Sequence, residues 1–183
     1  QLEAVCAVRA IASAYVFDPV PEAAALFAAD MGAGLGLDIA CASSVRQAVS
    51  GADIICCATT SARPILRDED VRPGTHVNAI GCYHPDRHEI PPETVARATI
   101  VVDQLAAARD EAGDLVLAVA AGLWRWQDVH AELGDIAAGH TPGRRYADEV
   151  TLFKSVGSAV QDVAAAVTAL ANARRLGLGT ELV

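Results

Sequence analysis

The amino-acid sequence predicts an α/β fold: a doubly wound domain with a mainly parallel sheet and helices on both faces. Short β-branched runs alternate with helical stretches along the chain. The run over residues 53–58 is apolar after its first residue, which is typical of a strand in a parallel sheet covered on both sides. With 52% hydrophobic residues among 183, the chain can also build a sizeable core.

The expected strands are short runs rich in Val, Ile, Tyr and Thr: residues 15–17, 37–40, 53–58, 75–80, 99–103 and 149–153. The expected helices have apolar residues at three- or four-residue spacing. They cover residues 1–10, 21–31, a short stretch from Ser44 to near Gly51, 104–133 with breaks at Gly113 and Gly122, and 155–176. Pro21 suits the first turn of its helix, Ser43 and Ser44 suit an N-cap, and Gly177 stops the last helix.

Charge and cysteine content exclude several classes of protein. The chain carries 14 Lys+Arg against 23 Asp+Glu, a net charge of −9, whereas nucleic acids and anionic membranes bind clustered basic residues. No apolar run is long enough for a transmembrane helix. The five cysteines include no CxxC pair and do not indicate a disulfide framework. We therefore expect a cytoplasmic protein that contacts neither nucleic acid nor membrane.

Candidate binding residues follow the predicted strands, because ligands of open parallel sheets bind outside the carboxyl ends of the strands. Asp18 ends the first strand, where an acid accepts hydrogen bonds from a dinucleotide ribose; Asp is equally a common turn former. The hydroxyl groups of Thr59, Thr60 and Ser61 suit either a cofactor or an ordinary loop. Gly81 would let the backbone come close to a flat ring.

The loop after Gly81 offers two further hypotheses. Arg87 could bind a substrate carboxylate through both guanidinium nitrogens, or could be an exposed solubilising charge. Cys82, His84, His88 and Glu89 match no zinc spacing, so we expect no metal. Elsewhere, adjacent Cys56 and Cys57 would point to opposite faces of their strand, and we expect small core residues rather than nucleophiles.

Several segments together resemble the ornithine cyclodeaminase/mu-crystallin family. They are residues 53–61, 64–66, 76–81, 85–89, 153–157 and 159–162; Asn78-Ala79-Ile80-Gly81 and Phe153-Lys154-Ser155-Val156-Gly157 are the specific parts. The resemblance covers essentially the whole chain. It implies a Rossmann-like domain, NAD as the cofactor, a small amino or imino acid as the substrate, and a homodimer when the protein is full length.

The resemblance also assigns roles to matching positions. Those that match cofactor-binding residues are Asp18, Thr59, Ile80, Gly81, Cys82, Tyr83 and Ser155. Arg87 matches a basic residue that holds the substrate carboxylate, and Val156 matches a substrate contact. Lys154, the only lysine of the chain, belongs to the Phe-Lys-Ser motif. No catalytic residue is assigned.

One departure from the family separates the possible functions. True cyclodeaminases carry an acid/base Asp where this chain has Tyr83, and a phenol with a pKa near 10 is a poor base at neutral pH. The leading hypothesis is therefore an NAD(H)-dependent oxidoreductase: a ketimine or Δ1-pyrroline-2-carboxylate reductase, or an alanine dehydrogenase-like enzyme. The alternatives are ornithine cyclodeaminase, with Asp86 or Glu89 as a substitute acid, and a non-catalytic mu-crystallin-like binding protein.

The resemblance begins just past the family's glycine loop, so we expect further chain before Gln1, where the sequence is already helical without an N-cap. The predicted division is an NAD-binding domain over residues 1–150 and, over 151–183, a helix that returns to an N-terminal dimerisation domain. Alone, this piece is expected to be inactive. The remote half of its long helix is expected to expose apolar surface.

Overall fold

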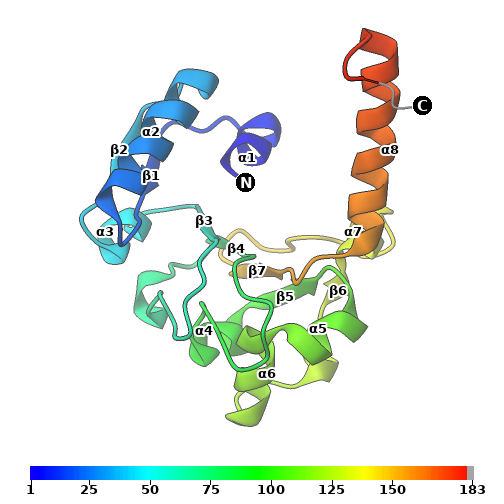
Figure 1. Ribbon diagram of the computed structural model, residues 1–183. Helices are drawn as coiled ribbons and strands as arrows, with labels where there is room; N and C mark the ends of the chain where they lie inside the picture. The colour runs from blue at the N-terminus through cyan, green and yellow to red at the C-terminus, as the bar shows by residue number, and fades with distance from the viewer. Residues whose placement is uncertain (181–183) are drawn as a thin grey trace.

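The computed structural model describes residues 1–180, which form two parallel sheets flanked by helices (Figure 1). The larger sheet has the strand order β3-β4-β7-β5-β6, and the smaller one pairs β1 with β2. Their bounds are β1 (Ala14–Val16), β2 (Ile39–Cys41), β3 (Ile54–Cys57), β4 (His76–Ala79), β5 (Thr99–Val102), β6 (Ala131–Glu132) and β7 (Thr151–Lys154). Every strand pair is parallel, which confirms the α/β fold.

Helices lie on both sides of the larger sheet. Figure 1 shows α4, α5 and α6 on one side, with α1 and α8 on the other. The bounds are α1 (Leu2–Val8), α2 (Pro21–Leu35), α3 (Val45–Val49), α4 (Pro92–Arg97), α5 (Leu105–Glu111), α6 (Gly113–Ala120), α7 (Leu133–Ala137) and α8 (Ala159–Leu176), with single 3-10 turns at Asp68–Asp70 and Trp126–Asp128. As expected, Ser44 caps α3 by accepting the Gln47 N–H.

The core lies between the larger sheet and α4 to α6. Val77, Ile100 and Leu152 come from three neighbouring strands and are fully buried, as is Leu115 of α6. Strand residues alternate between the two faces, so the other face carries half-buried or exposed side chains such as Cys56 and Asn78. Cys57 belongs to the core as expected, but Cys56 does not.

Two expectations about the second half of the chain are wrong. Residues 104–133 are not helical throughout: α6 ends at Ala120, and the two-residue strand β6 closes the sheet edge against β5. The long helix begins at Ala159 rather than at residue 155, because Gly157 adopts a left-handed φ of +93° and the amides before the helix bind a side chain of the sheet.

Helix α8 exposes apolar side chains to solvent, as the sequence predicts. None of its residues is buried, and Val160, Val163, Val167 and Leu170 are exposed along one stripe. The predicted division after residue 150 stays a prediction; β7 pairs within the larger sheet, and residues 181–183 lie outside the described residues. Within residues 1–180, no helix is long and apolar enough to span a membrane.

Candidate functional site

Two hollows adjoin each other at the carboxyl ends of the strands, and Tyr83 borders both. The larger cavity, of about 530 Å³, is lined by Gln1, Ile80, Tyr83, Leu133, Phe153, Ser155, Val156, Gly157 and Gln161. The smaller hollow, of about 50 Å³, is lined by Thr60, Ser61, Gly81, Cys82, Tyr83, His84 and Arg87. The larger volume lies in the range of small-molecule binding sites.

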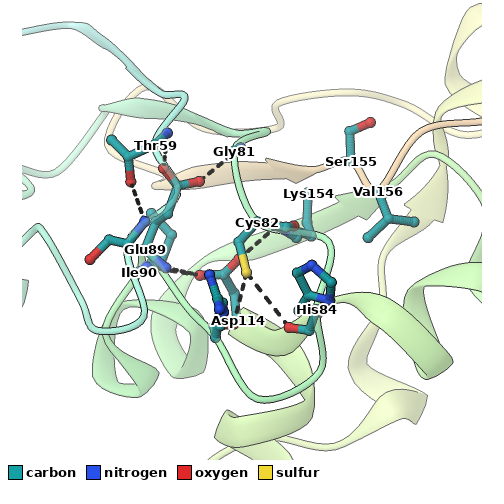
Figure 2. Close-up of polar contacts among 12 residues, drawn as sticks. Thr59, Gly81, Cys82, His84, Glu89, Ile90, Asp114, Lys154, Ser155 and Val156 are labelled. Carbon is teal, nitrogen blue, oxygen red and sulfur yellow. Dashed lines mark hydrogen bonds and ion pairs between the residues drawn. The ribbon is translucent and has the colours of Figure 1, made fainter.

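A buried carboxylate joins the ends of β3 and β4. Glu89 is fully buried, and its two oxygens accept the amide N–H groups of Thr59 (2.6 Å) and Gly81 (2.8 Å), as Figure 2 shows. A Cβ on Gly81 would lie 2.2 Å from the Thr59 nitrogen. The close approach of the Thr59 backbone therefore requires a glycine at this position. The sequence suggested a different reason for the same glycine, the close approach of a flat ring of the ligand.

A second buried acid lies beneath the same loop. Asp114 of α6 accepts the amides of Glu89 (2.7 Å) and Ile90 (2.8 Å) through Oδ1, and its Oδ2 lies 2.7 Å from the Nζ of Lys154. Lys154, the last residue of β7, also donates to the carbonyl oxygen of Cys82. All three side chains, Lys154, Asp114 and Glu89, are inaccessible to solvent.

Two side chains of the loop over residues 82–89, Tyr83 and Arg87, point away from the buried Glu89, Asp114 and Lys154. Tyr83 is 56% exposed and stacks at a tilt on His84. Arg87 is exposed beside the smaller hollow, and its guanidinium has no ion pair within residues 1–180. The Cys82 thiol points inward and donates to the Arg87 carbonyl; burial raises the pKa of this thiol, so it stays protonated.

Asp103, one residue past β5, shapes the wall of the larger cavity. One of its oxygens, Oδ2, accepts the Ser155 hydroxyl (2.8 Å) and the amides of Val156 (2.9 Å) and Gly157 (2.8 Å). This contact fixes the segment between β7 and α8, which places Ser155 and Val156 at the cavity. Sequence reasoning did not single out Asp103, although a carboxylate directly after a predicted strand was a usable signal.

The residues proposed from the sequence thus fall into three groups. Nine of them line a hollow: Thr60, Ser61, Ile80, Gly81, Cys82, Tyr83, Arg87, Ser155 and Val156. Thr59 lies beside them, with its amide committed to Glu89. Asp18 lines neither hollow; it follows β1, which pairs only with β2, and its carboxylate accepts the Val20 amide at 2.7 Å.

Metal-ligating side chains do not gather at this site. Within residues 1–180, no three His, Cys, Asp or Glu side chains form a group that could hold a metal ion. Glu89, one of the four residues considered above as ligands, uses both oxygens on backbone amides.

The sequence profile of the ornithine cyclodeaminase/mu-crystallin family matches residues 1–175. The chain belongs to this family. One family member, the Δ(1)-pyrroline-2-carboxylate reductase of Bacillus cereus, is 36% identical over 181 residues, which are 98% of this chain and 55% of that protein. The ketimine reductase mu-crystallin of Rattus norvegicus is 42% identical over 129 residues, which are 70% of this chain and 38% of the length of that protein.

A solved structure of the same family superimposes closely. The Δ(1)-pyrroline-2-carboxylate reductase of Thermococcus litoralis, in complex with NADH and L-proline, matches the whole chain with a TM-score of 0.95 and 39% identity. The match covers 56% of that protein. The chain therefore spans about half the length of the relatives it matches.

Proposed function

We propose that the protein carrying this chain is an NAD(H)-dependent reductase of a small cyclic imino acid. The observation that carries the proposal concerns carboxylates: within residues 1–180, no Asp or Glu lines either hollow. The cyclodeaminases of this family use an Asp as the acid/base of deamination, and the resemblance implies that Tyr83 stands at that position in this chain. Reduction of a C=N bond does not need a carboxylate at that position.

The two substitute acids do not serve deamination either. Glu89 is buried, with both oxygens bound by backbone amides, so it has no oxygen left for a substrate. Asp86 lies on the exposed part of the loop and borders neither hollow. This arrangement favours the reductase over the cyclodeaminase.

The residues present fit a nicotinamide cofactor. The larger cavity has the volume for a ring and ribose, apolar walls from Ile80 and Val156, and a hydroxyl from Ser155. The exposed carboxylate of Asp18, at the end of β1, suits the ribose hydroxyls of the adenosine half. When bound, NAD(H) supplies or accepts the hydride. Relatives solved with NADH or NAD+ support the same assignment.

The protein's own groups bind and orient the substrate. Arg87, a guanidinium without an ion pair in the described chain, binds the substrate carboxylate beside the smaller hollow. Tyr83 and the Ile80 side of the cavity shield the reacting carbon from water. The exposed apolar stripe on α8, with Val160, Val163 and Val167, is expected to pack against the N-terminal dimerisation domain of the complete protein, and the homodimer follows from the family resemblance.

A substrate panel with the complete protein tests the proposal. Loss of NADH absorbance is followed with Δ1-pyrroline-2-carboxylate, with Δ1-piperideine-2-carboxylate, and with pyruvate plus ammonia. We expect the fastest turnover with one of the cyclic imines. Turnover with pyruvate plus ammonia alone would favour an alanine dehydrogenase, and NADH binding without any turnover would favour a binding protein. Residues 1–183 alone are expected to be inactive.

A further inference from the structure

The loop over residues 82–89 is fastened at both ends to one buried ion pair. At its start, the Cys82 carbonyl accepts a hydrogen bond from Lys154; at its end, the amides of Glu89 and Ile90 donate to Asp114. Lys154 and Asp114 are themselves 2.7 Å apart, between β7 and α6 (Figure 2). The residues between these attachment points include Tyr83 and Arg87, which border the hollows.

Stability alone does not explain this pair. Taking two opposite charges out of water is costly, and well-packed apolar side chains of similar volume often serve a core as well or better. Lys154 and Asp114 are both completely inaccessible to solvent. We therefore expect the pair to have a further role. Its contacts with the 82–89 loop indicate that this role is to hold the loop in place.

The direction of one peptide bond follows from the lysine. The Cys82 carbonyl points inward to Lys154, and the described chain has no cis peptide bond. In a trans peptide the N–H points opposite to the C=O. The Tyr83 N–H therefore points away from the buried pair, and within residues 1–180 it has no hydrogen-bond partner. Tyr83 borders both hollows, so this unpaired amide belongs to a residue of the site.

We propose that Lys154 and Asp114 are positioning residues: their buried ion pair holds the 82–89 loop and turns the Tyr83 amide toward a carboxylate or carboxamide oxygen of the bound ligand. The ligand side of this proposal rests on the function proposed above. The positioning of the loop does not, because it can be measured without any ligand.

The test uses the double variant Lys154→Met/Asp114→Asn in the complete protein. Replacing Lys154 alone would leave an unpaired buried charge, whereas the double variant removes both charges. The Asn side chain keeps an oxygen for the Glu89 and Ile90 amides. Glu149→Gln is the matched control: Glu149 binds Arg145 and Thr99 at the other end of the strands, so its loss affects stability without touching the loop.

Hydrogen–deuterium exchange of the 82–89 peptide in unliganded protein is the first measurement. We expect exchange about tenfold faster in the double variant and unchanged in Glu149→Gln. Exchange within about twofold of the wild type would overturn the proposal. Should the double variant not fold, Lys154→Leu/Asp114→Asn, which also removes both charges, is measured in the same way, with the same criterion for failure.

Kinetics with NADH and the cyclic imine then identify the oxygen that the Tyr83 amide binds. We expect kcat/KM of the double variant to fall about tenfold or more. A rise in the imine KM with NADH affinity unchanged indicates the substrate carboxylate, and weaker NADH binding indicates the carboxamide. Unchanged kinetics together with faster exchange would overturn the ligand contact. A wild-type protein that reduces no cyclic imine would contradict the proposed function instead. In that case the exchange measurement still tests whether the ion pair holds the 82–89 loop.

Discussion

A Cβ on Gly81 would lie 2.2 Å from the amide nitrogen of Thr59 and 2.3 Å from its carbonyl oxygen. The ends of β4 and β3 therefore meet through bare backbone, with the Glu89 carboxylate bound to both amides. Because this junction begins the loop that borders both hollows, the glycine has a structural role that precedes any contact with a ligand.

Replacement of this glycine should be severely destabilising. A Cβ at this separation forces one strand end away from the other and breaks the Glu89 contacts, so we expect Gly81→Ala to lower the free energy of unfolding by more than about 3 kcal/mol. Urea denaturation of the complete protein measures this. Gly34→Ala is the control, since a Cβ at this position of α2 would meet nothing within 4 Å, and a gain of roughly 0.5–1 kcal/mol is expected. Equal stability of the two variants would contradict the account.

The role of Arg87 is tested by removing its charge. Arg87→Met should raise the KM for a cyclic imino acid by about 30-fold or more, because a charge-assisted, two-pronged contact with the carboxylate contributes about 2 kcal/mol. NADH affinity should change little. Arg63→Met, in an exposed neighbouring loop, is the control and should leave KM unchanged. An unaltered KM in Arg87→Met would return this residue to the role of a solubilising surface charge.

The preference between cofactors is tested at Asp18. A carboxylate facing a 2′-phosphate at contact distance should weaken NADPH binding relative to NADH by about 1–3 kcal/mol, or five- to 150-fold. No arginine follows to receive the phosphate, since the next residues are Pro19, Val20 and Pro21. Fluorescence titrations of the complete protein compare the two dissociation constants, and Asp18→Ala should narrow the gap. Tighter binding of NADPH to the wild type would be the contrary result.

Acid stability is tested at Glu149. Burial alone would raise the pKa of this carboxyl, but hydrogen bonds from Thr99 and Arg145 and the charge of Arg145 hold the pKa at about 2. A folded pKa below the unfolded value of 4.5 gives stability that is complete above pH 4.5 and is lost as the pH falls toward 2.

Glu149→Gln removes that contribution. The variant should therefore be less stable than the wild type at pH 6, by about 1 kcal/mol, and the difference should shrink as the pH approaches 2. Urea midpoints at several pH values measure it. A difference that stays constant across this range would show that the ionised form of Glu149 is not what stabilises the fold.

Local patterns in the sequence predicted most of the fold. Apolar or alternating runs identified β3, β4, β5 and β7, because each of these strands is buried on at least one face. The edge strand β6 was not predicted, since Ala131 and Glu132 carry no β-branched side chain and only the pairing with β5 makes them a strand. The start of α8 was misplaced because its boundary depends on Asp103, 53 residues before Val156.

The site was also predictable only where its residues are close together in the sequence. Strand ends and the family motif indicated Ile80, Gly81 and Ser155, which are neighbours along short segments. The contacts that hold those segments were not visible, because Glu89 and Asp114 act on residues 30 and 25 positions away. Such partners follow from the packing of α6 beneath the loop, and no local spacing encodes them.

The stoichiometry of cofactor use tests the central claim most directly. The complete protein is mixed with NADH and Δ1-pyrroline-2-carboxylate, and in a parallel reaction with NAD+ and ornithine. The amounts of NADH, proline and ammonia are measured in both reactions. A reductase without a deaminating acid should consume one NADH for each proline and release no ammonia from ornithine. Formation of proline and ammonia from ornithine without net change in NADH would contradict the claim, because a cyclodeaminase regenerates its cofactor in every turnover.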